Sequence, residues 1–319
     1  MEAQELTGRI YDIQGFSIQD GPGIRTTAFL KGCPLRCPWC HSPESQLFSK
    51  QLSWISMRCE GTAACRERCL KACDKNALEY GPSRIDIQTK KALRLVHVKR
   101  DLCDNCGKCA DACYPNALTL TGTDYTADEL VSILLKDRLF FETSGGGVTI
   151  SGGEALSQPE YTLAVLKKLK EEGIHTAVDT TGYAKWEIIE SVLPYTDLFL
   201  YDIKHMNSGR HKQAVGVPNE LILNNAKRLA LAGGKLQIRI PVIPMFNDDV
   251  DNIRKTAEFC KVLGHAVEVV QLLPYHNLGA MKYLRISDNP AVEAVPPSDE
   301  HMQMLKEIIE EYGLNVMIH

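Results

Sequence analysis

The stretch GCPLRCPWC, which runs from Gly32 to Cys40, carries three cysteines, Cys33, Cys37 and Cys40, in a C-x3-C-x2-C pattern. It directly follows an apolar, β-branched segment, residues 24–30, which predicts a strand that ends at this loop. Thiolates are soft ligands that suit iron–sulfur clusters, so the loop can hold three irons of a 4Fe–4S cube. Because no fourth cysteine follows nearby, the fourth iron would stay open to a substrate or cofactor. A zinc site closed by His41 is the alternative, since structural zinc takes four Cys or His ligands.

The composition limits the possible function classes. A chain of 319 residues with 44% hydrophobic residues is long enough for one large domain or two moderate ones. A net charge of −4 gives no sign of a nucleic-acid partner. The acidic start has no apolar signal region, and no run of eighteen apolar residues predicts a membrane span. We expect a cytoplasmic monomer that binds neither nucleic acid nor a membrane.

Eleven of the twelve cysteines lie between Cys33 and Cys113. In a cytoplasmic chain such clusters indicate metal ligands rather than disulfides. Cys260 stands alone in an apolar helical pattern and is expected to be a buried hydrophobic residue.

Two further cysteine runs occupy residues 51–121, and each ends in a matching x-Asn-Ala-Leu tail. This duplication resembles a two-cluster bacterial ferredoxin, in which the fourth cysteine of each run ligates the other cluster. The resemblance assigns one 4Fe–4S cluster to Cys59, Cys65, Cys69 and Cys113, and a second to Cys73, Cys103, Cys106 and Cys109. The gaps between the cysteines of the first run depart from the usual ferredoxin spacing. The alternative for the two runs is a pair of structural zinc sites.

Outside this insert, short apolar strands alternate with helical patterns, which is typical of βαβ units and a parallel sheet. An additional strand is expected at residues 8–17. Six strands that alternate with helices are expected at residues 24–30, 148–150, 175–178, 198–201, 236–242 and 267–272. Helices are expected at residues 125–141, 161–172, 186–193, 221–232, 253–263 and 298–312. Six such strands are fewer than the eight of a closed barrel.

Polar residues follow the predicted strands, and sites form where the carboxyl ends of parallel strands meet. Gly152 and Gly153 would let backbone approach a ligand closely. Charged side chains end the next three strands: Asp179, Asp202, Lys204 and Arg239. They suit the ammonium and carboxylate of an amino acid, and Arg239 could grip a carboxylate with two hydrogen bonds. Each residue alone is more often a solvated charge, whereas the set behind a three-cysteine loop favours a site.

The cysteine spacing with Trp39 before the third cysteine resembles the radical S-adenosylmethionine (SAM) enzymes. The motifs DGPGIR at Asp20–Arg25 and GVTISGGE at Gly147–Glu154 are similar to those of the activating enzymes of glycyl radical enzymes. The resemblance implies a partial (β/α)6 radical SAM barrel, residues 1–50 and 122–319. A ferredoxin-like insert, residues 51–121, would carry two of three 4Fe–4S clusters.

The resemblance also implies roles for individual residues. Cys33, Cys37 and Cys40 would hold the catalytic cluster, and Asp20 would meet the glycine loop of the partner. Asp179, Thr180 and Asp202 match positions that can hold a monovalent cation. SAM would be bound by Trp39, Gly152, Gly153, Glu154, Asp179, Asp202, Ile203, Lys204, Arg239 and His276, the last at the adenosine.

The implied function is cleavage of SAM to a 5′-deoxyadenosyl radical, which removes hydrogen from a glycine of a glycyl radical enzyme. An electron donor such as flavodoxin or ferredoxin would supply electrons to the cluster. The insert would either relay these electrons or dock the partner. The alternatives are a radical SAM enzyme that acts on a small molecule or peptide through auxiliary clusters, and a ferredoxin-type electron carrier. The absence of C-terminal cysteine clusters argues against the first, and the three-cysteine loop argues against the second.

Overall fold

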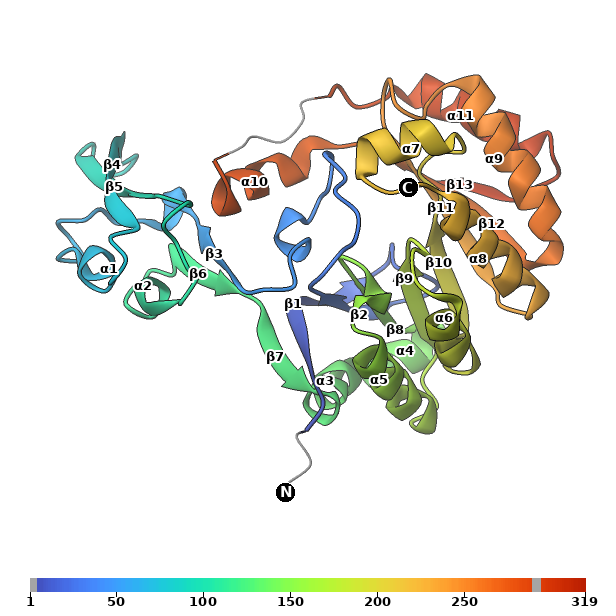
Figure 1. The fold of residues 1–319 in the computed structure, drawn as a ribbon, viewed down its shortest axis with the longest axis horizontal. Coiled ribbons are helices and arrows are strands. Elements are labelled where there is room, and N and C mark those ends of the chain that lie inside the picture. The colour runs from blue at the N-terminus through green and yellow to red at the C-terminus, as the bar shows by residue number, and fades with distance from the viewer. Residues whose placement is uncertain (1–4, 289–293) are drawn as a thin grey trace. The chain divides into compact units, whose positions relative to one another are not determined.

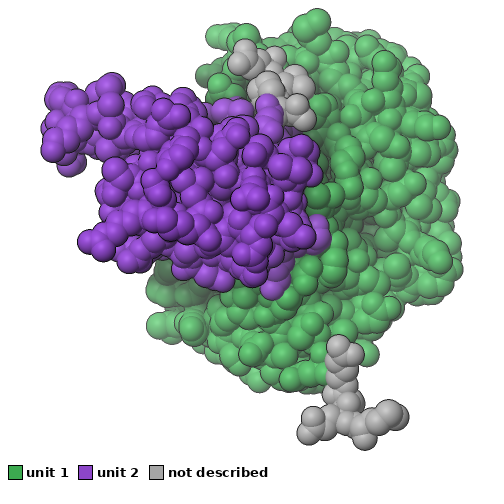
Figure 2. All heavy atoms as spheres, turned by 60° about the vertical axis from the view of Figure 1, so that its left-hand side comes forward, with its two compact units in different colours: residues 1–48, 123–279, 292–319 green, residues 49–122, 280–291 purple. Residues whose placement is uncertain are grey.

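The computed structural model describes residues 5–288 and 294–319, and these divide into two compact units (Figure 2). The first unit is drawn from residues 1–48, 123–279 and 292–319, and the second from residues 49–122 and 280–291. Helix α10 (Ala280–Ile286), which the sequence analysis assigns to the barrel, groups with the second unit because it packs on strand β3 (Gln51–Trp54). Within the described residues, no helix is long and apolar enough to cross a membrane.

The first unit is built on one mixed sheet of nine strands in the order β13-β12-β11-β10-β9-β8-β2-β1-β7 (Figure 1). The strands are β1 (Thr7–Ser17), β2 (Arg25–Leu30), β7 (Thr123–Thr126), β8 (Gly147–Gly152), β9 (Thr176–Thr180), β10 (Leu198–Asp202), β11 (Leu236–Val242), β12 (Val267–Pro274) and β13 (Val316–Ile318). The order is linear, so the sheet is open.

The six alternating strands expected from the sequence are confirmed as β2 and β8 to β12, and they run parallel in chain order. The short strands β7 and β13 were not expected, since each has fewer than five residues and little apolar patterning. The expected strand near the N-terminus is β1, which pairs antiparallel with both β2 and β7. Parallel order brings the carboxyl ends of the six strands to one edge.

The helices that follow the strands are α3 (Ala127–Leu134), α4 (Arg138–Ser144), α5 (Pro159–Glu171), α6 (Trp186–Val192), α7 (Ser208–Val215), α8 (Glu220–Leu231), α9 (Val250–Leu263) and α11 (Asp299–Glu310). All of these but α4 and α7 pack side by side in chain order and cover one face of the sheet (Figure 1). The helix expected at residues 125–141 is interrupted by a 3-10 turn between α3 and α4. Their apolar faces and the strands form one core, in which Cys260 is fully buried as expected.

Two of the expected helices begin at capping residues. Thr126 and Glu129 form a reciprocal capping box at α3, in which each side chain accepts a backbone N–H of the other residue. Ser298 caps α11 by accepting the N–H of His301. Each cap satisfies donors that the first helical turn leaves without a partner.

The second unit holds two antiparallel strand pairs and short helices. Strand β3 pairs with β6 (Leu118–Thr121), and β4 (Leu78–Ile85) pairs with β5 (Ala92–Val98). Helices α1 (Arg68–Lys71) and α2 (Lys108–Asp111) each follow a residue in the left-handed region and each lie inside one of the two cysteine runs. The duplicated sequence therefore forms a duplicated local structure.

Candidate active site

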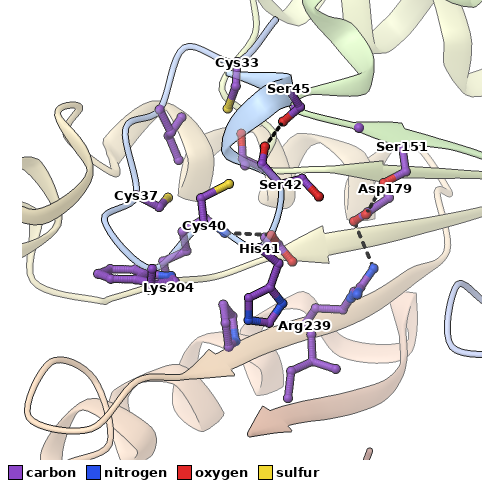
Figure 3. Close-up of a pocket in the computed structure, with 18 of the residues that line it drawn as sticks. Cys33, Cys37, Cys40, His41, Ser42, Ser45, Ser151, Asp179, Lys204 and Arg239 are labelled. Carbon is purple, nitrogen blue, oxygen red and sulfur yellow. Dashed lines mark hydrogen bonds and ion pairs between the residues drawn. The ribbon is translucent and has the colours of Figure 1, made fainter. Parts of the chain in front are cut away.

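A cavity of about 290 Å³ lies where the loops after the parallel strands converge (Figure 3). It brings together most of the residues that the sequence analysis selects for the barrel. The cavity is lined by Cys33, Cys37, Cys40, Asp20, Trp39, Gly152, Gly153, Asp179, Asp202, Lys204 and Arg239, among others.

The three-cysteine loop is held in place by backbone hydrogen bonds to the segment that follows it. The N–H of Gly32 donates to Ser45 over 2.7 Å, and the N–H of Cys33 donates to Gln46 over 3.1 Å. The side chains of Cys33, Cys37 and Cys40 face the same part of the cavity (Figure 3). The loop is thus folded around a common space.

Burial raises the pKa of Cys33 and of Cys37 to about 12 and also raises the pKa of Cys40. Near neutral pH these free thiols therefore keep their protons. Iron must displace the protons to bind, because the thiolate is the metal ligand.

Strand register places the charged residues on one face of the sheet. Asp202 on β10 lies directly opposite Arg239 on β11, and Asp179 on β9 lies opposite Leu200. Leu200 and Asp202 are two residues apart on one strand, so their side chains share a face. All three charged side chains consequently project from the same side of three adjacent strands.

Two ion pairs form within this set. Lys204 Nζ lies 2.7 Å from Asp202 Oδ2, and Arg239 Nη1 lies 3.1 Å from Asp179 Oδ1. Burial raises the pKa of the Asp179 carboxyl to about 6, although Arg239 opposes this rise. Burial alone would lower the pKa of Lys204, but Asp202 and Cys37 outweigh it and raise that pKa.

Arg239 retains buried donors that no residue in the described part of the chain satisfies. Its Nε and Nη1 atoms are buried and have no hydrogen-bond acceptor of adequate geometry, although Nη1 is close to Asp179. A buried donor without an acceptor costs about 1–3 kcal/mol. The arrangement therefore suits an anionic ligand whose oxygen atoms would accept these N–H groups.

Four residues that the family resemblance selects lie outside the cavity lining: Glu154, Thr180, Ile203 and His276. The Glu154 carboxylate is 2% exposed and accepts hydrogen bonds from Leu156, Thr180 and Thr181. Ile203 is buried, and its N–H donates to the backbone of Arg239. His276 is exposed, but its ring stacks on the cavity residue His41 with centroids 3.8 Å apart.

The glycine pair after β8 is required by the backbone packed against it. A Cβ on Gly152 would lie 2.2 Å from backbone atoms of Leu30, and a Cβ on Gly153 would lie 2.6 Å from the carbonyl oxygen of Gly32. Gly152 also has a φ of +128°, in the region that favours glycine. The pair thus lets the GGE turn lie directly against the start of the cysteine loop.

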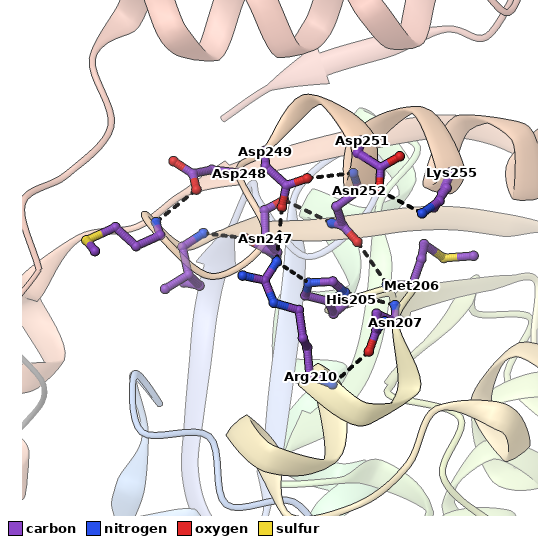
Figure 4. Close-up of polar contacts among 12 residues, drawn as sticks. His205, Met206, Asn207, Arg210, Asn247, Asp248, Asp249, Asp251, Asn252 and Lys255 are labelled. Atoms are coloured by element: carbon purple, nitrogen blue, oxygen red, sulfur yellow. Dashed lines mark hydrogen bonds and ion pairs between the residues drawn. The ribbon is translucent and has the colours of Figure 1, made fainter.

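Trp39 packs on Phe246 with ring centroids 4.6 Å apart, inside the rim formed by the loops after β10 and β11. Asn247, which the sequence analysis missed, lies among the polar contacts of these two loops (Figure 4) and holds the loops together. Its side-chain amide donates to the carbonyls of Lys204 and Pro241 at 2.8 and 2.7 Å. An asparagine in a loop carries no pattern that would have revealed this contact.

The Asp20 turn is fixed from beneath by a buried arginine. Arg25 is 0% exposed, and its Nε donates to Thr149 Oγ1 over 2.6 Å. The same hydroxyl donates to the backbone carbonyl of Asp20 over 2.6 Å. The Asp20 carboxylate accepts from Ser17 and Thr27 and lines the cavity.

In the second unit, each of two further cavities is lined by four cysteines drawn from both runs. Cys59, Cys65, Cys69 and Cys113 line one, and Cys73, Cys103, Cys106 and Cys109 line the other. In each case the fourth cysteine of one run joins the first three of the other. Burial and the neighbouring thiols raise the pKa of Cys69 to about 11 and of Cys109 to about 12.

Backbone amides already point at several of these sulfurs. Ala77 donates to Cys73 Sγ at 3.3 Å and Leu118 to Cys113 Sγ at 3.4 Å. Asn76 and Asn116, from the matching tails, adopt left-handed conformations with φ of 51° and 52°. Within residues 5–288 and 294–319, no three His, Cys, Asp or Glu side chains converge closely enough to hold a single metal ion.

The chain is similar to known proteins over nearly its whole length. The model of the radical SAM superfamily matches residues 108–260. An isethionate sulfite-lyase activating enzyme from Nitratidesulfovibrio vulgaris is 40% identical over 311 residues, which cover 97% of each chain. A trans-4-hydroxy-L-proline dehydratase activating enzyme from Clostridioides difficile is 41% identical over 313 residues, covering 97% of this chain and 98% of that protein.

The chain is also similar to a third activating enzyme and to one solved domain. A choline trimethylamine-lyase activating enzyme from Oleidesulfovibrio alaskensis is 37% identical over 317 residues, 98% of each chain. The crystal structure of a domain of pyruvate-formate lyase-activating enzyme from Bacteroides vulgatus is 40% identical, covers 55% of this chain and 99% of that one, and superposes with a TM-score of 0.47.

Proposed function

Because the chain belongs to the radical SAM activating enzymes of glycyl radical enzymes, we propose that the cavity of the three-cysteine loop is the site where SAM is cleaved. The chain is an oxidoreductase that cleaves SAM reductively and removes a hydrogen atom from a glycine of a glycyl radical enzyme. One observation carries the assignment of the site. The three thiols of the cysteine loop and the charged ends of β9, β10 and β11 line a single cavity.

Cys33, Cys37 and Cys40 would hold a 4Fe–4S cluster, and the donor set fits because three thiols face one space with no fourth cysteine among its lining residues. When bound, this cluster supplies the electron that cleaves SAM into methionine and a 5′-deoxyadenosyl radical. The protein contributes orientation and exclusion of water around that chemistry.

The methionyl end of SAM carries a carboxylate and an ammonium group. Arg239 would donate its two unsatisfied N–H groups to the carboxylate, because they are buried at the cavity. Asp179 and Asp202 would attract the ammonium, and Lys204 would limit the negative charge that they present. Trp39 and His41 supply flat surfaces on the same cavity, and His276 would contact the adenosine through its stack on His41.

Glu154 and Ile203 would act on SAM only indirectly. The Glu154 carboxylate joins the loops after β8 and β9, and Ile203 joins β10 to β11 through its backbone. A monovalent cation at Asp179 and Asp202 would compete with Arg239 and Lys204 for the same oxygens. Replacing potassium with lithium in the assay buffer, and measuring the KM for SAM, tests this cation.

In the second unit we propose two 4Fe–4S clusters in a ferredoxin-like arrangement. Two observations support this proposal. Each cavity is lined by three cysteines of one run and the fourth cysteine of the other run. Backbone N–H groups also donate to Cys73 and Cys113, and hydrogen bonds to sulfur help to set the reduction potential of such clusters. Two structural zinc sites are the alternative, and iron and zinc analysis of the purified protein distinguishes the two.

The partner would be a glycyl radical enzyme of the dehydratase or lyase type, by analogy with the names of the relatives. Asp20 would contact its glycine loop, because Asp20 lies at the cavity on a braced turn. We further propose that the protein is a monomer in a reducing, cytoplasmic compartment, where thiolate-bound clusters persist. A flavodoxin or ferredoxin would supply its electrons.

The test begins with anaerobic reconstitution and iron analysis. We expect about twelve irons per chain if three cubes form. Cys37→Ala should lose about four irons and all 5′-deoxyadenosine formation with dithionite, whereas Cys69→Ala should lose about four irons but keep that formation. Cys260→Ala, a change in the apolar core, is the control and should keep the full iron content.

The second part of the test adds the partner. A glycyl radical signal in the electron spin resonance spectrum of a cognate enzyme supports the activating function. Cleavage of SAM with no such signal in any encoded glycyl radical enzyme would instead favour a radical SAM enzyme of small molecules or peptides.

A further inference from the structure

The second unit has a charge that differs in sign from that of the rest of the chain. Residues 49–122 contain thirteen Lys and Arg against eight Asp and Glu, a net charge of +5. The whole chain has a net charge of −4, so the other residues together carry −9. Positive charge is therefore concentrated in the unit that holds two of the three cysteine sets.

The basic side chains are not spread evenly over this unit. Six of them lie close in sequence to Cys59, Cys65 and Cys69 or contact residues of this region, and we call them the basic face: Arg58, Arg66, Arg68, Lys71, Arg84 and Arg94. Glu60 and Glu67 oppose them near the cysteines, and Asp86 opposes Arg84.

Contacts tie these side chains to the cavity. Arg68 lines it, and Arg84 donates to the carbonyl of Cys59 over 2.9 Å. Arg58 donates to the carbonyl of Asn116, three residues after Cys113. Lys71 lies 3.6 Å from Glu67, so it neutralises one of the opposing acids.

Two exposed tyrosines lie within the same face. Tyr114 is 62% exposed, directly follows Cys113, and carries the Arg68 guanidinium 4.6 Å above its ring. Tyr80 is 51% exposed, lies under Arg94, and donates to Glu67 over 2.6 Å. Tyrosine and arginine are enriched in protein interfaces because they offer large, rigid contact surfaces.

The other cysteine cavity of this unit lacks such a charge excess. Four basic residues near it are balanced by four acidic ones: Lys75, Lys99, Arg100 and Lys108 against Asp74, Asp101, Asp104 and Asp111. Lys108 pairs with Asp74, and the Arg100 guanidinium is directed inward to the carbonyls of Leu52 and Arg285. The asymmetry singles out the cavity of Cys59 as the one presented to an anionic partner.

We propose that the basic face is the docking site of an acidic electron-transfer protein with a flavin or iron–sulfur centre. The donor loses one electron, and the cluster held by Cys59, Cys65, Cys69 and Cys113 gains it. Four thiolates give that cluster a net negative charge, so without the basic face an acidic donor would be repelled. This inference rests on the proposed function, because it requires that the second unit hold clusters.

The test is anaerobic stopped-flow mixing of the reconstituted protein with a photoreduced flavodoxin of known negative charge, followed by cluster absorbance. Electrostatic steering changes association rates about 10- to 1,000-fold and weakens with salt. We expect the wild-type rate constant to fall as salt rises. Arg66→Glu with Lys71→Glu should slow reduction at low salt at least tenfold, and it should weaken flavodoxin binding in a calorimetric titration.

The matched control is Lys90→Glu with Lys91→Glu, the same change of charge at the turn between β4 and β5. It should stay within about twofold of wild type, since its lysines lie outside the basic face and steering falls with distance. Equal slowing of both double variants, or no slowing of either, would overturn the docking site. Dithionite needs no docking, so 5′-deoxyadenosine formed with dithionite tests the proposed function separately. Its absence in wild type would refute that function, whatever the flavodoxin rates.

Discussion

The Arg239 guanidinium lies 3.1 Å from the Asp179 carboxylate, although strand β10 separates the strands that carry them. Arg239 thus reaches across the end of β10, over the position of Asp202. It does so with two donors left unsatisfied. The pair holds the guanidinium in place in advance, so that a carboxylate can bind without reordering the side chain.

The first prediction concerns this arginine. Arg239→Lys should raise the KM for SAM about 10- to 100-fold, because a hydrogen bond to a charged group contributes about 1.5–3 kcal/mol and lysine lacks the planar fork. At saturating SAM, 5′-deoxyadenosine formation should stay within a few-fold of wild type. The assay is dithionite-driven cleavage over a range of SAM concentrations.

Arg228→Lys, on the outer helix α8 over Trp186, is the matched control and should leave the KM unchanged. Equal KM values for wild type and Arg239→Lys, at equal iron content, would show that Arg239 does not bind the carboxylate of SAM.

The second prediction separates a structural from a ligand-binding role for Glu154. Its carboxylate accepts from the N–H of Leu156 and from both the N–H and the hydroxyl of Thr181. Glu154→Ala should destabilise the protein by about 2–4 kcal/mol, because each buried donor without an acceptor costs about 1–3 kcal/mol. The urea midpoint, measured by circular dichroism, should fall accordingly.

Glu154→Gln keeps one acceptor oxygen and should lose less stability than Glu154→Ala. Both variants should change the KM for SAM less than Arg239→Lys does. A large rise in KM with an unchanged urea midpoint would contradict this division and would place the carboxylate on the ligand.

Glu154 also illustrates what sequence can and cannot predict. Strand ends are visible in sequence because apolar runs stop at polar residues, and the six strand–helix units were found in this way. Which polar side chain turns to the cavity and which turns to a neighbouring loop depends on register and on partners far along the chain. Glu154 and Asp179 look alike in sequence, yet only Asp179 lines the cavity.

The unit to which helix α10 belongs could not be predicted from the sequence either. Its seven residues have no pattern that reveals whether they pack on the sheet or on strand β3 of the second unit. Local motifs were predictable where one short stretch determines the geometry, as at the capping box of Thr126 and Glu129. The support that Asn247 gives to the rim depends on two distant carbonyls, so no local signal exists.

The third prediction concerns the bridge beneath Asp20. Thr149→Val removes the hydroxyl that accepts from Arg25 and donates to the Asp20 carbonyl, while the shape of the side chain is kept. If the turn of Asp20 receives the glycine loop, the glycyl radical yield in the partner should fall about tenfold, because a lost buried hydrogen bond costs about 1–3 kcal/mol. Cleavage of SAM without the partner should persist.

Thr162→Val removes a comparable buried hydroxyl, which donates to Ala155, and serves as the control for lost stability. Its radical yield should match wild type. The role of the turn is refuted if both valine variants reduce the radical yield equally, or if Thr149→Val abolishes SAM cleavage and radical yield together.

The fourth prediction concerns acid stability. Burial lowers the pKa of His211 below its ordinary value of 6.5, against the opposing effect of its hydrogen bond to Val217. The side chain is 1% exposed, and its Nε2 has no partner in the described structure. A group whose pKa is lower in the folded state is protonated preferentially in the unfolded state, so folding is favoured less as pH falls.

The contribution of His211 is therefore fully present above about pH 6.5 and is lost progressively below it, by at most about 1.4 kcal/mol per pH unit. His211→Asn keeps a donor for the Val217 carbonyl but cannot take up a proton in this range. Urea midpoints at pH 7.5 and 5.5 should differ less for this variant than for wild type. Other histidines with lowered pKa, such as His175 and His205, are present in both proteins and cancel in the comparison. An equal loss of stability in the two proteins would mean that the pKa of His211 is the same in the folded and the unfolded chain, so that its burial contributes nothing to acid sensitivity.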